Sequence, residues 1–290
     1  MIGEVANTMS FVFPSSSNEM TDEEFRLFSL LVYEECGINL KIEKRSFLQN
    51  RIVQRMKATG IKSFYRYYKL VTNDEGGKVE LLAFLDALTI NETSFYRNKP
   101  QLDLFQYSVL PEILSKKRAA NNFTLKIWSA GCSTGQEPYT IAMILNDVMT
   151  DIKGWKVNIF ASDLSLTALE AAQQGIYPKE KTEGVDEASL RRYFIEKGGN
   201  VQVKDELKRL IIFDFHNLMY DNGFSHIDVI FCRNVMIYFD SQTQKGVIER
   251  FYQCLVPKGH LFLGHTETLQ GVNDNFIFIH KNKGTAYQKK

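Results

Sequence analysis

Clustered cysteines and long apolar runs are missing from this 290-residue sequence. The four cysteines, Cys36, Cys132, Cys232 and Cys254, form no Cys-x-x-Cys pair and do not cluster with the five histidines. That spacing predicts free thiols in a reducing cytoplasm and argues against a structural zinc or other metal site. The chain begins with no secretory signal, and no apolar run approaches the roughly 18 residues that a membrane span needs. We therefore expect a soluble, cytoplasmic protein without direct membrane insertion.

Net charge is also nearly absent, because 35 Lys and Arg residues stand against 34 Asp and Glu residues. A net charge of +1 creates no global field that would attract nucleic acid or an anionic membrane, so a charged partner must be recognised locally. With 44% hydrophobic and 24% charged residues, the composition is typical of a globular protein with a sizeable core. The length predicts about two domains.

The first 90 residues indicate a short tail followed by a helical domain. Residues 1–20 contain Pro14 and a serine run, which favours a flexible N-terminal tail. Thr21 and Glu24 have the spacing of a helix N-cap, and Gly37 is a plausible end of that helix. Further helices are expected over residues 44–58, 64–68 and 80–89. Because no convincing strand precedes residue 90, residues 21–90 are predicted to form a small all-helical domain.

Residues 91–290 have the pattern of an α/β domain. Apolar runs alternate with helical patterns, which predicts a parallel sheet with crossover helices; the runs cover residues 125–128, 157–160, 210–213, 227–232 and 260–263. Residues 276–279 and 285–287 lie too close together for a crossover and are expected to form an antiparallel hairpin. The connection before the third run is too long for one helix. Its apolar alternation around Gly198-Gly199 predicts an inserted antiparallel β-subdomain at about residues 176–213.

The first predicted strand leads into a loop of small residues and then a helix. Ala130-Gly131-Cys132-Ser133-Thr134-Gly135 follows the strand, and the helix begins near Gln136. Gly131 and Gly135 allow close approach of the backbone to a nucleotide-like cofactor at the carboxyl ends of parallel strands. The loop has neither the Gly-x-Gly-x-x-Gly pattern of dinucleotide folds nor the Lys-Ser or Lys-Thr of a phosphate-binding loop.

Asp163 ends the second predicted strand, beside the glycine loop. A carboxylate at this position can bind both ribose hydroxyls of a cofactor. The alternative is that Asp163 caps the helix that begins near Leu164.

Six segments in order resemble the chemotaxis receptor methyltransferases, the CheR type of protein-glutamate O-methyltransferase that uses S-adenosylmethionine. The resemblance covers nearly the whole chain, and its segments are residues 35–40, Asn91–Arg97, Trp128–Tyr139, Ser162-Asp163, Asn217-Leu218 and Phe231–Phe239. It implies a Rossmann-like methyltransferase sheet over residues 91–290, preceded by the helical substrate-recognition domain.

The resemblance also implies which residues contact S-adenosylmethionine or its product S-adenosylhomocysteine. With Gly131 of the loop they are Asn91, Thr93, Arg97, Glu137, Asp163, Asn217, Leu218, Arg233 and Asn234. Simpler roles stay open for some of them: Asn217 as a helix cap, Arg233 as a salt-bridge partner and Asn91 as an N-cap.

The implied reaction transfers a methyl group to a glutamate side chain of a chemoreceptor. Because Glu has a pKa of about 4.3, the nucleophile is already ionised near neutral pH and needs no general base. Arg97 and Tyr238 are the expected catalytic residues, Arg97 by gripping a carboxylate and Tyr238 by orienting the attacking oxygen. Arg97 bound to the cofactor's own carboxylate would instead be a binding residue, and Tyr238 would instead be a packed aromatic.

The helical domain carries a local basic cluster. Lys44, Arg51 and Arg55 are expected on one face of its second helix, suited to a partner helix that bears carboxylates. The resemblance identifies that partner as the cytoplasmic methylation helices of chemoreceptors; a merely solvated face and a polyanion are the alternatives. Because the turn at Glu196–Asn200 is compact, we expect no dependence on a receptor C-terminal peptide tether.

Two other functions are compatible with these residues. One is a methyltransferase that modifies a different protein carboxylate or a small carboxylic acid. The other is a non-catalytic module that senses the cofactor or docks signalling proteins.

Overall fold

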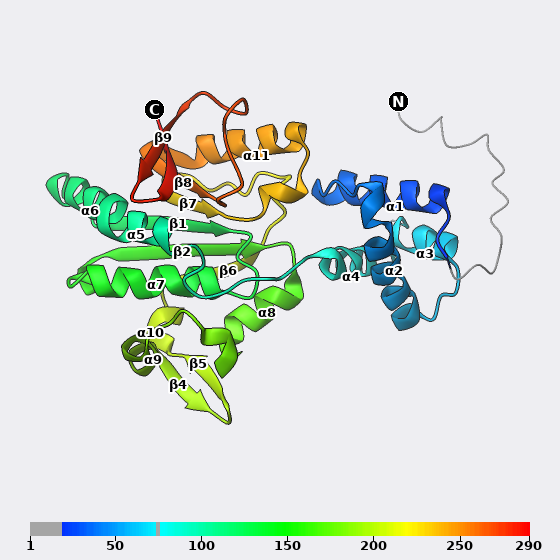
Figure 1. The fold of residues 1–290 in the computed structure, drawn as a ribbon, viewed down its shortest axis with the longest axis horizontal. Coiled ribbons are helices and arrows are strands. Elements are labelled where there is room, and N and C mark those ends of the chain that lie inside the picture. The colour runs from blue at the N-terminus through cyan, green and yellow to red at the C-terminus, as the bar shows by residue number, and fades with distance from the viewer. Residues whose placement is uncertain (1–18, 74–75) are drawn as a thin grey trace. The chain divides into compact units, whose positions relative to one another are not determined.

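The computed structural model describes residues 19–73 and 76–290, so the predicted tail lies almost entirely outside the described residues. The chain divides into two compact units (Figure 1). We call the first, made of the chain up to Glu34 together with Leu40–Leu88, the helical unit. The second, made of Glu35–Asn39 and Thr89–Lys290, is the sheet unit.

Among the described residues, the helical unit contains the four predicted helices and one 3-10 turn that was not predicted. They are α1 (Asp22–Cys36), the 3-10 turn η1 (Ile42–Lys44), α2 (Arg45–Thr59), α3 (Phe64–Val71) and α4 (Lys78–Leu88). The N-cap predicted for α1 is confirmed, because the Thr21 N–H donates to Glu24 Oε2 at 2.9 Å and the Glu24 N–H donates to Thr21 Oγ1 at 3.2 Å. Phe28, Tyr67 and Phe84 are fully buried and pack edge-on or stacked against one another.

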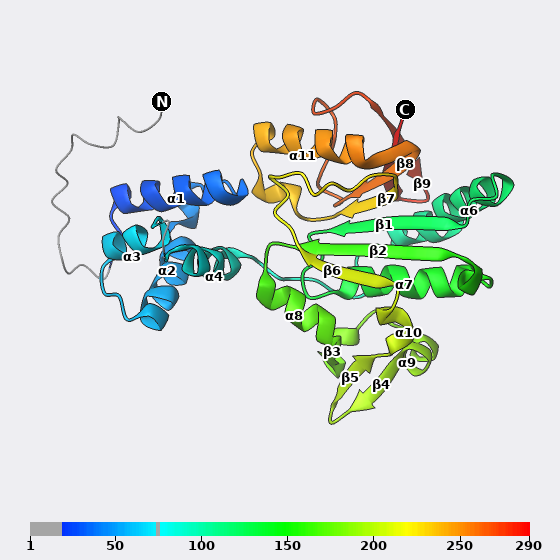
Figure 2. The same ribbon diagram turned by 180° about the vertical axis from the view of Figure 1, so that it is seen from behind.

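The sheet unit contains a seven-stranded sheet in the order β6-β2-β1-β7-β8-β10-β9 (Figure 2). Its strands are β1 (Thr124–Ala130), β2 (Lys156–Asp163), β6 (Ile211–Phe215), β7 (Ile227–Cys232), β8 (Leu255–Leu263), β9 (Phe276–Lys281) and β10 (Gly284–Lys289). The first five strands in that order pair in parallel, and β10 and β9 add an antiparallel hairpin. The predicted Rossmann-like sheet and its terminal hairpin are confirmed.

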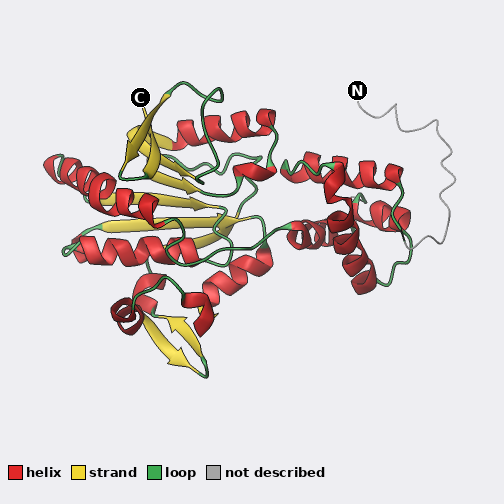
Figure 3. Cartoon of the chain, viewed as in Figure 1, coloured by secondary structure: helices red, strands yellow, loops and turns green. Residues whose placement is uncertain are grey.

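Helices cover both faces of this sheet (Figure 3). They are α5 (Lys99–Leu104), the π-helical turn η2 (Phe105–Val109), α6 (Leu110–Ala119), α7 (Gln136–Val148), η3 (Ile152–Gly154), α8 (Leu166–Gln174), η5 (Met236–Tyr238) and α11 (Ser241–Cys254). Neighbouring strand residues alternate between two cores: Ile127 packs with α7 and α6, whereas Trp128 packs with α11. Burial on both faces explains why the strands appear as continuous apolar runs.

The inserted subdomain is a separate antiparallel sheet with the strand order β3-β5-β4. Its elements are β3 (Ile176–Pro178), η4 (Lys179–Thr182), α9 (Glu187–Tyr193), β4 (Phe194–Lys197), β5 (Asn200–Val203) and α10 (Asp205–Lys208). The hairpin predicted around Gly198-Gly199 is therefore present. The predicted range 176–213 extends too far, because Ile211–Phe213 pairs with β2 in the large sheet. Strand β3 was not predicted, since three residues that include a proline show no alternation.

Candidate functional site

The glycine loop between β1 and α7 is held against the end of β2. The N–H groups of Gly131 and Cys132 both donate to the Ser162 carbonyl, at 2.8 and 2.9 Å. Gly131 has φ +80°, and a Cβ built on it would lie 2.4 Å from Val235 Cγ2. Only glycine fits this position without strain, because both the backbone conformation and the space exclude a side chain.

Asp163 bridges this loop and the helix that follows β2. Its Oδ2 accepts from the Ser133 N–H at 2.7 Å, and its Oδ1 accepts from the Ser165 N–H at 2.9 Å. The N-cap of α8 is Ser165, whose Oγ accepts from the Ala168 N–H, so the capping role considered for Asp163 belongs to Ser165. Asn91 also reaches the loop, since its Oδ1 accepts from Ser133 Oγ at 3.3 Å.

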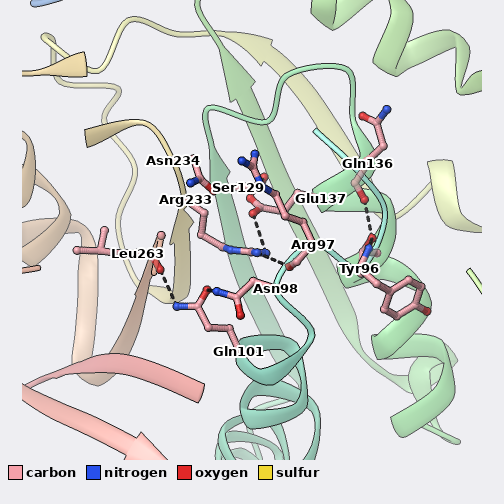
Figure 4. Close-up of polar contacts among 12 residues, drawn as sticks. Tyr96, Arg97, Asn98, Gln101, Ser129, Gln136, Glu137, Arg233, Asn234 and Leu263 are labelled. Carbon is pink, nitrogen blue, oxygen red and sulfur yellow. Dashed lines mark hydrogen bonds and ion pairs between the residues drawn. The ribbon is translucent and has the colours of Figure 1, made fainter. Parts of the chain in front are cut away.

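Arg233 and Glu137 form a buried ion pair next to the glycine loop (Figure 4). Arg233 Nη1 is 3.4 Å from Glu137 Oε2, and the two side chains are 3% and 14% exposed. Ser129 Oγ donates to Glu137 Oε1 at 2.7 Å. Burial raises the pKa of Glu137, while Arg233, Ser129 and Arg97 act in the opposite direction. Burial lowers the pKa of Arg233, opposed by the nearby Glu137.

The segment that carries Arg97 has an unusual backbone. Tyr96 and Asn98, on either side of Arg97, have φ +51° and +58°. The Arg97 carbonyl accepts from Arg233 Nη2, and Asn98 Nδ2 donates to Gln101 Oε1 at 3.1 Å. Gln101, 1% exposed, in turn donates to the Leu263 carbonyl at 2.6 Å, as the dashed line in Figure 4 shows. These contacts compensate the cost of left-handed backbone at residues other than glycine.

Tyr238 and Asn234 follow the end of β7. Tyr238 is half-buried in η5, and burial raises the pKa of its hydroxyl, while the charge of Arg97 opposes that rise. The charge of Arg97 lowers the pKa values of Tyr238, Glu137 and Arg233. The structure thus brings Arg97, Glu137, Arg233 and Asn234 together in one cluster (Figure 4).

Family models match most of the chain. The model described as "CheR methyltransferase, SAM binding domain" matches residues 91–285, and that described as "CheR methyltransferase, all-alpha domain" matches residues 23–89. The chain belongs to the CheR methyltransferase family. The resemblance seen in the sequence is confirmed, and this CheR-family protein is an S-adenosylmethionine-dependent methyltransferase of chemotaxis.

Named relatives align with the CheR-family chain along its length. A chemotaxis protein methyltransferase of Borreliella burgdorferi is 35% identical over 278 residues, which cover 94% of this chain and 97% of that protein. One of Escherichia coli is 37% identical over 265 residues, covering 89% of this chain and 88% of that protein. The solved N-methyltransferase NodS of Bradyrhizobium japonicum, in complex with S-adenosylhomocysteine, has a TM-score of 0.38 and 10% identity, covering 78% of this chain and 97% of that one.

The side chains of the CheR-family site fit the chemistry of S-adenosylmethionine. Asp163 offers a carboxylate beside the glycine loop, as a ribose diol requires. Arg233 Nε is buried and has no hydrogen-bond partner within the described part of the chain, which leaves a donor for a carboxylate. Within residues 19–73 and 76–290, no group of three His, Cys, Asp or Glu side chains could hold a metal ion.

Within the described residues, three of the predicted cofactor residues form no hydrogen bond or ion pair with either the glycine loop or this cluster. Asn217 Nδ2 donates to the Glu35 carbonyl at 2.6 Å, and its Oδ1 accepts from the Met219 N–H at 3.0 Å. Leu218 is 8% exposed and belongs to the core between the sheet and α11. Thr93 is half-buried in the loop between Asn91 and Phe95.

The predicted recognition face of the helical unit needs correction. Lys44 lies in η1, ahead of α2, rather than within the helix. Arg55 forms a two-bond pair with Glu80, through Nε at 2.9 Å and Nη2 at 2.7 Å, so its charge is offset within the unit. Burial of Glu80 alone would raise its pKa, but hydrogen bonds from Arg55 and Tyr67 outweigh this effect and lower the pKa.

The Arg51 guanidinium lies over the Phe47 ring, 5.2 Å from its centroid. The sequence could not show the Arg55–Glu80 pair, because the two residues are on different helices.

Sequence reasoning also missed three residues that hold the site together. Ser129 orients Glu137, Gln101 holds the Arg97 segment, and Glu267 binds the turn that leads to Tyr238. Ser129 has a detectable signal, because a polar residue that is fully buried within an apolar strand needs a hydrogen-bond partner. Gln101 and Glu267 carry no such signal in the sequence.

Proposed function

We propose that this protein methylates glutamate side chains in the cytoplasmic methylation helices of chemoreceptors, forming glutamyl methyl esters. The observation that carries the proposal is the cluster of Arg97, Glu137, Arg233 and Asn234 beside a glycine loop held by Asp163 (Figure 4). Family membership supplies the reaction class. We place the reaction in the cytoplasm; no helix of the described residues could cross a membrane.

The cofactor side of the site would be held by residues from several loops. Asp163 would bind the ribose, while Arg233 and Glu137 would bind the charged end of the methionine part. Gly131 allows close backbone approach, and the remaining binding residues would be Asn91, Thr93, Asn217, Leu218 and Asn234. When bound, the cofactor supplies a methyl group on a positively charged sulfur.

Arg97 and Tyr238 would act on the acceptor. Arg97 is exposed, and its Nη1 donates to the Glu92 carbonyl at 2.9 Å, so the rest of its guanidinium is available to a carboxylate. The Tyr238 hydroxyl is protonated at neutral pH, as for any tyrosine, and burial raises its pKa further, so it can donate to the attacking oxygen. The acceptor anion and the sulfonium cation neutralise one another in the transition state. Tight ionic binding of the acceptor would therefore stabilise the reactants more than the transition state. In-line positioning and exclusion of water should therefore provide most of the rate.

The function is tested by incubating the protein with methyl-labelled S-adenosylmethionine and membranes that contain chemoreceptors. Base-labile label in the receptor band is the expected result. Reactions without enzyme, and with Arg97→Ala, are the controls. Cofactor binding without receptor label would contradict the proposal, and would favour another carboxylate acceptor or a sensing module.

Arg97→Ala separates the two roles of this residue. If Arg97 holds and orients the acceptor, turnover should fall by about a hundredfold, as when a reacting group is misplaced. Affinity for S-adenosylhomocysteine, measured by calorimetry, should stay within about threefold of wild type. A loss of affinity as large as the loss of turnover would make Arg97 a cofactor-binding residue instead.

We propose that Lys44 and Arg51, without Arg55, contribute cationic contacts to the receptor helix. The protein should act without a receptor C-terminal peptide tether, because β4 and β5 are joined by the two-residue turn Gly198-Gly199. Pulldown with receptor C-terminal peptides should give no retention. Saturable micromolar binding would contradict this prediction.

A further inference from the structure

Glu267, in the loop after β8, has a carboxylate that accepts three backbone hydrogen bonds. Its Oε2 accepts from the Asn234 N–H at 3.0 Å and the Gly264 N–H at 2.5 Å, and its Oε1 accepts from the Ile237 N–H at 3.2 Å. Gly264 directly follows β8, whereas Asn234 and Ile237 lie at the two ends of the turn after β7. One side chain therefore joins the ends of two neighbouring strands to the start of η5.

The turn that Glu267 binds needs external support. Asn234 has φ +61°, a left-handed conformation that is unfavourable for residues other than glycine. The packing is close, since a Cβ built on Gly264 would lie 2.7 Å from Glu267 Oε2 and 3.0 Å from the Asn234 nitrogen. The turn leads within two residues into η5, which carries Tyr238.

We propose that Glu267 is a positioning residue for methyl transfer. By fixing the N–H groups at both ends of the turn, it sets the direction of the Asn234 side chain and the place of the Tyr238 hydroxyl. Its charge also acts on the site, because Glu267 contributes to the electrostatic surroundings of Arg233 and Tyr238. The assignment of Tyr238 to the reaction rests on the proposed function, whereas the anchoring of the turn does not.

Geometry predicts different effects for two substitutions. In Glu267→Gln the amide oxygen can still accept from Asn234 and Gly264, but the amide NH₂ then faces the Ile237 N–H, donor against donor. The Asn234 end stays held and the η5 end is released. In Glu267→Ala both ends of the turn are released. The atoms that this substitution removes from the side chain correspond to one acetate ion. The removed atoms adjoin a pocket that is lined in part by Met236, Ile237 and Leu269.

The experiment measures kcat for receptor methylation, the Kd for S-adenosylhomocysteine and the melting temperature of both variants. We expect Glu267→Gln to lower kcat about tenfold with Kd within about threefold of wild type. We expect Glu267→Ala to lower kcat and raise Kd, each by about tenfold or more. Acetate in the assay should restore part of the rate of Glu267→Ala and none of the rate of Glu267→Gln. A purely structural role would lower the melting temperature without this selective rescue.

Exposed Glu170 on α8 provides the matched controls, Glu170→Gln and Glu170→Ala, which should behave as wild type. Wild-type kcat and Kd in both Glu267 variants, or a Glu267→Ala enzyme that no small carboxylate rescues, would overturn the proposal. If Glu267→Ala does not fold, the kcat of Glu267→Gln decides. If the wild-type protein labels no receptor, the proposed function fails, and the Kd of Glu267→Ala alone decides: a tenfold rise supports the anchoring of the turn and no change refutes it.

Discussion

At the scale of single residues, several side chains of the site bind backbone groups of distant segments. Arg233 binds the Arg97 carbonyl, 136 residues away in the chain, and Gln101 binds the Leu263 carbonyl, 162 residues away. Such contacts orient a loop without occupying its functional side chains. Arg97 can therefore have a fixed backbone and an exposed guanidinium at the same time.

Replacing Gln101 with leucine tests this kind of support. The substitution leaves the buried Leu263 carbonyl without its donor and Asn98 without its acceptor. We expect a loss of about 2 kcal/mol in the free energy of unfolding, measured with urea, together with a fall in kcat. Gln101→Glu should be worse, because it places a buried carboxylate against the carbonyls of Leu263 and Thr285. Unfolding free energies within about 0.5 kcal/mol of wild type would show that the amide gives no net support.

At the scale of elements, the glycine loop is shaped by its neighbours as well as by its own residues. The Ser162 carbonyl fixes two of its N–H groups, Asp163 fixes a third, and Val235 of the turn after β7 fills the space beside Gly131. Contacts within the chain therefore hold the loop in shape, which lowers the entropic cost of binding.

Gly131→Ala should displace the loop. The added Cβ meets Val235 Cγ2 and forces a positive φ on alanine, so affinity for S-adenosylhomocysteine should fall about tenfold or more in calorimetric titration. Adding Val235→Ala should recover part of that affinity by removing the clash but not the backbone strain. Gly154→Ala is the control, because nothing lies within 4 Å of a Cβ there. Wild-type affinity in Gly131→Ala would show that the loop adapts.

At the scale of the whole molecule, one buried histidine should make stability depend on pH. His260 on β8 is 2% exposed, and its pKa is lowered from 6.5 to about 4, mainly by burial; Glu112 opposes this shift and Lys116 adds to it. Its Nε2 lies 3.2 Å from Gln288 Nε2, and its Nδ1 has no hydrogen-bond partner within the described residues. The folded protein thus holds the ring neutral where the unfolded chain would protonate it.

Between pH 6.5 and pH 4 the unfolded chain binds more protons at this site, so stability falls as pH falls through that window. The loss should be about 2 kcal/mol at pH 5 relative to pH 8. His260→Gln should flatten this part of the profile of unfolding free energy against pH, while exposed His265→Gln should leave it unchanged. An equal slope in wild type and His260→Gln would assign the effect to other groups.

The order and type of most elements could be predicted from the sequence alone, because hydrophobic periodicity, caps and glycine turns act over a few residues. The N-cap at Thr21, the five parallel strands and the hairpin around Gly198-Gly199 all follow from such local patterns. The motifs also determined the family and the cofactor, since they lie within continuous segments. Short β3 escaped prediction because its pairing with β5 depends on a strand more than 20 residues away.

The partner of each polar group could not be predicted and follows from the fold. The fold pairs Arg233 with Glu137, Asn217 with the Glu35 carbonyl and Arg55 with Glu80, so the charge of Arg55 is offset within its own unit. It also showed Glu267 holding the turn that leads to Tyr238. Hydrogen bonds and ion pairs depend on distance and burial, and the fold brings together groups that are up to 184 residues apart in the sequence.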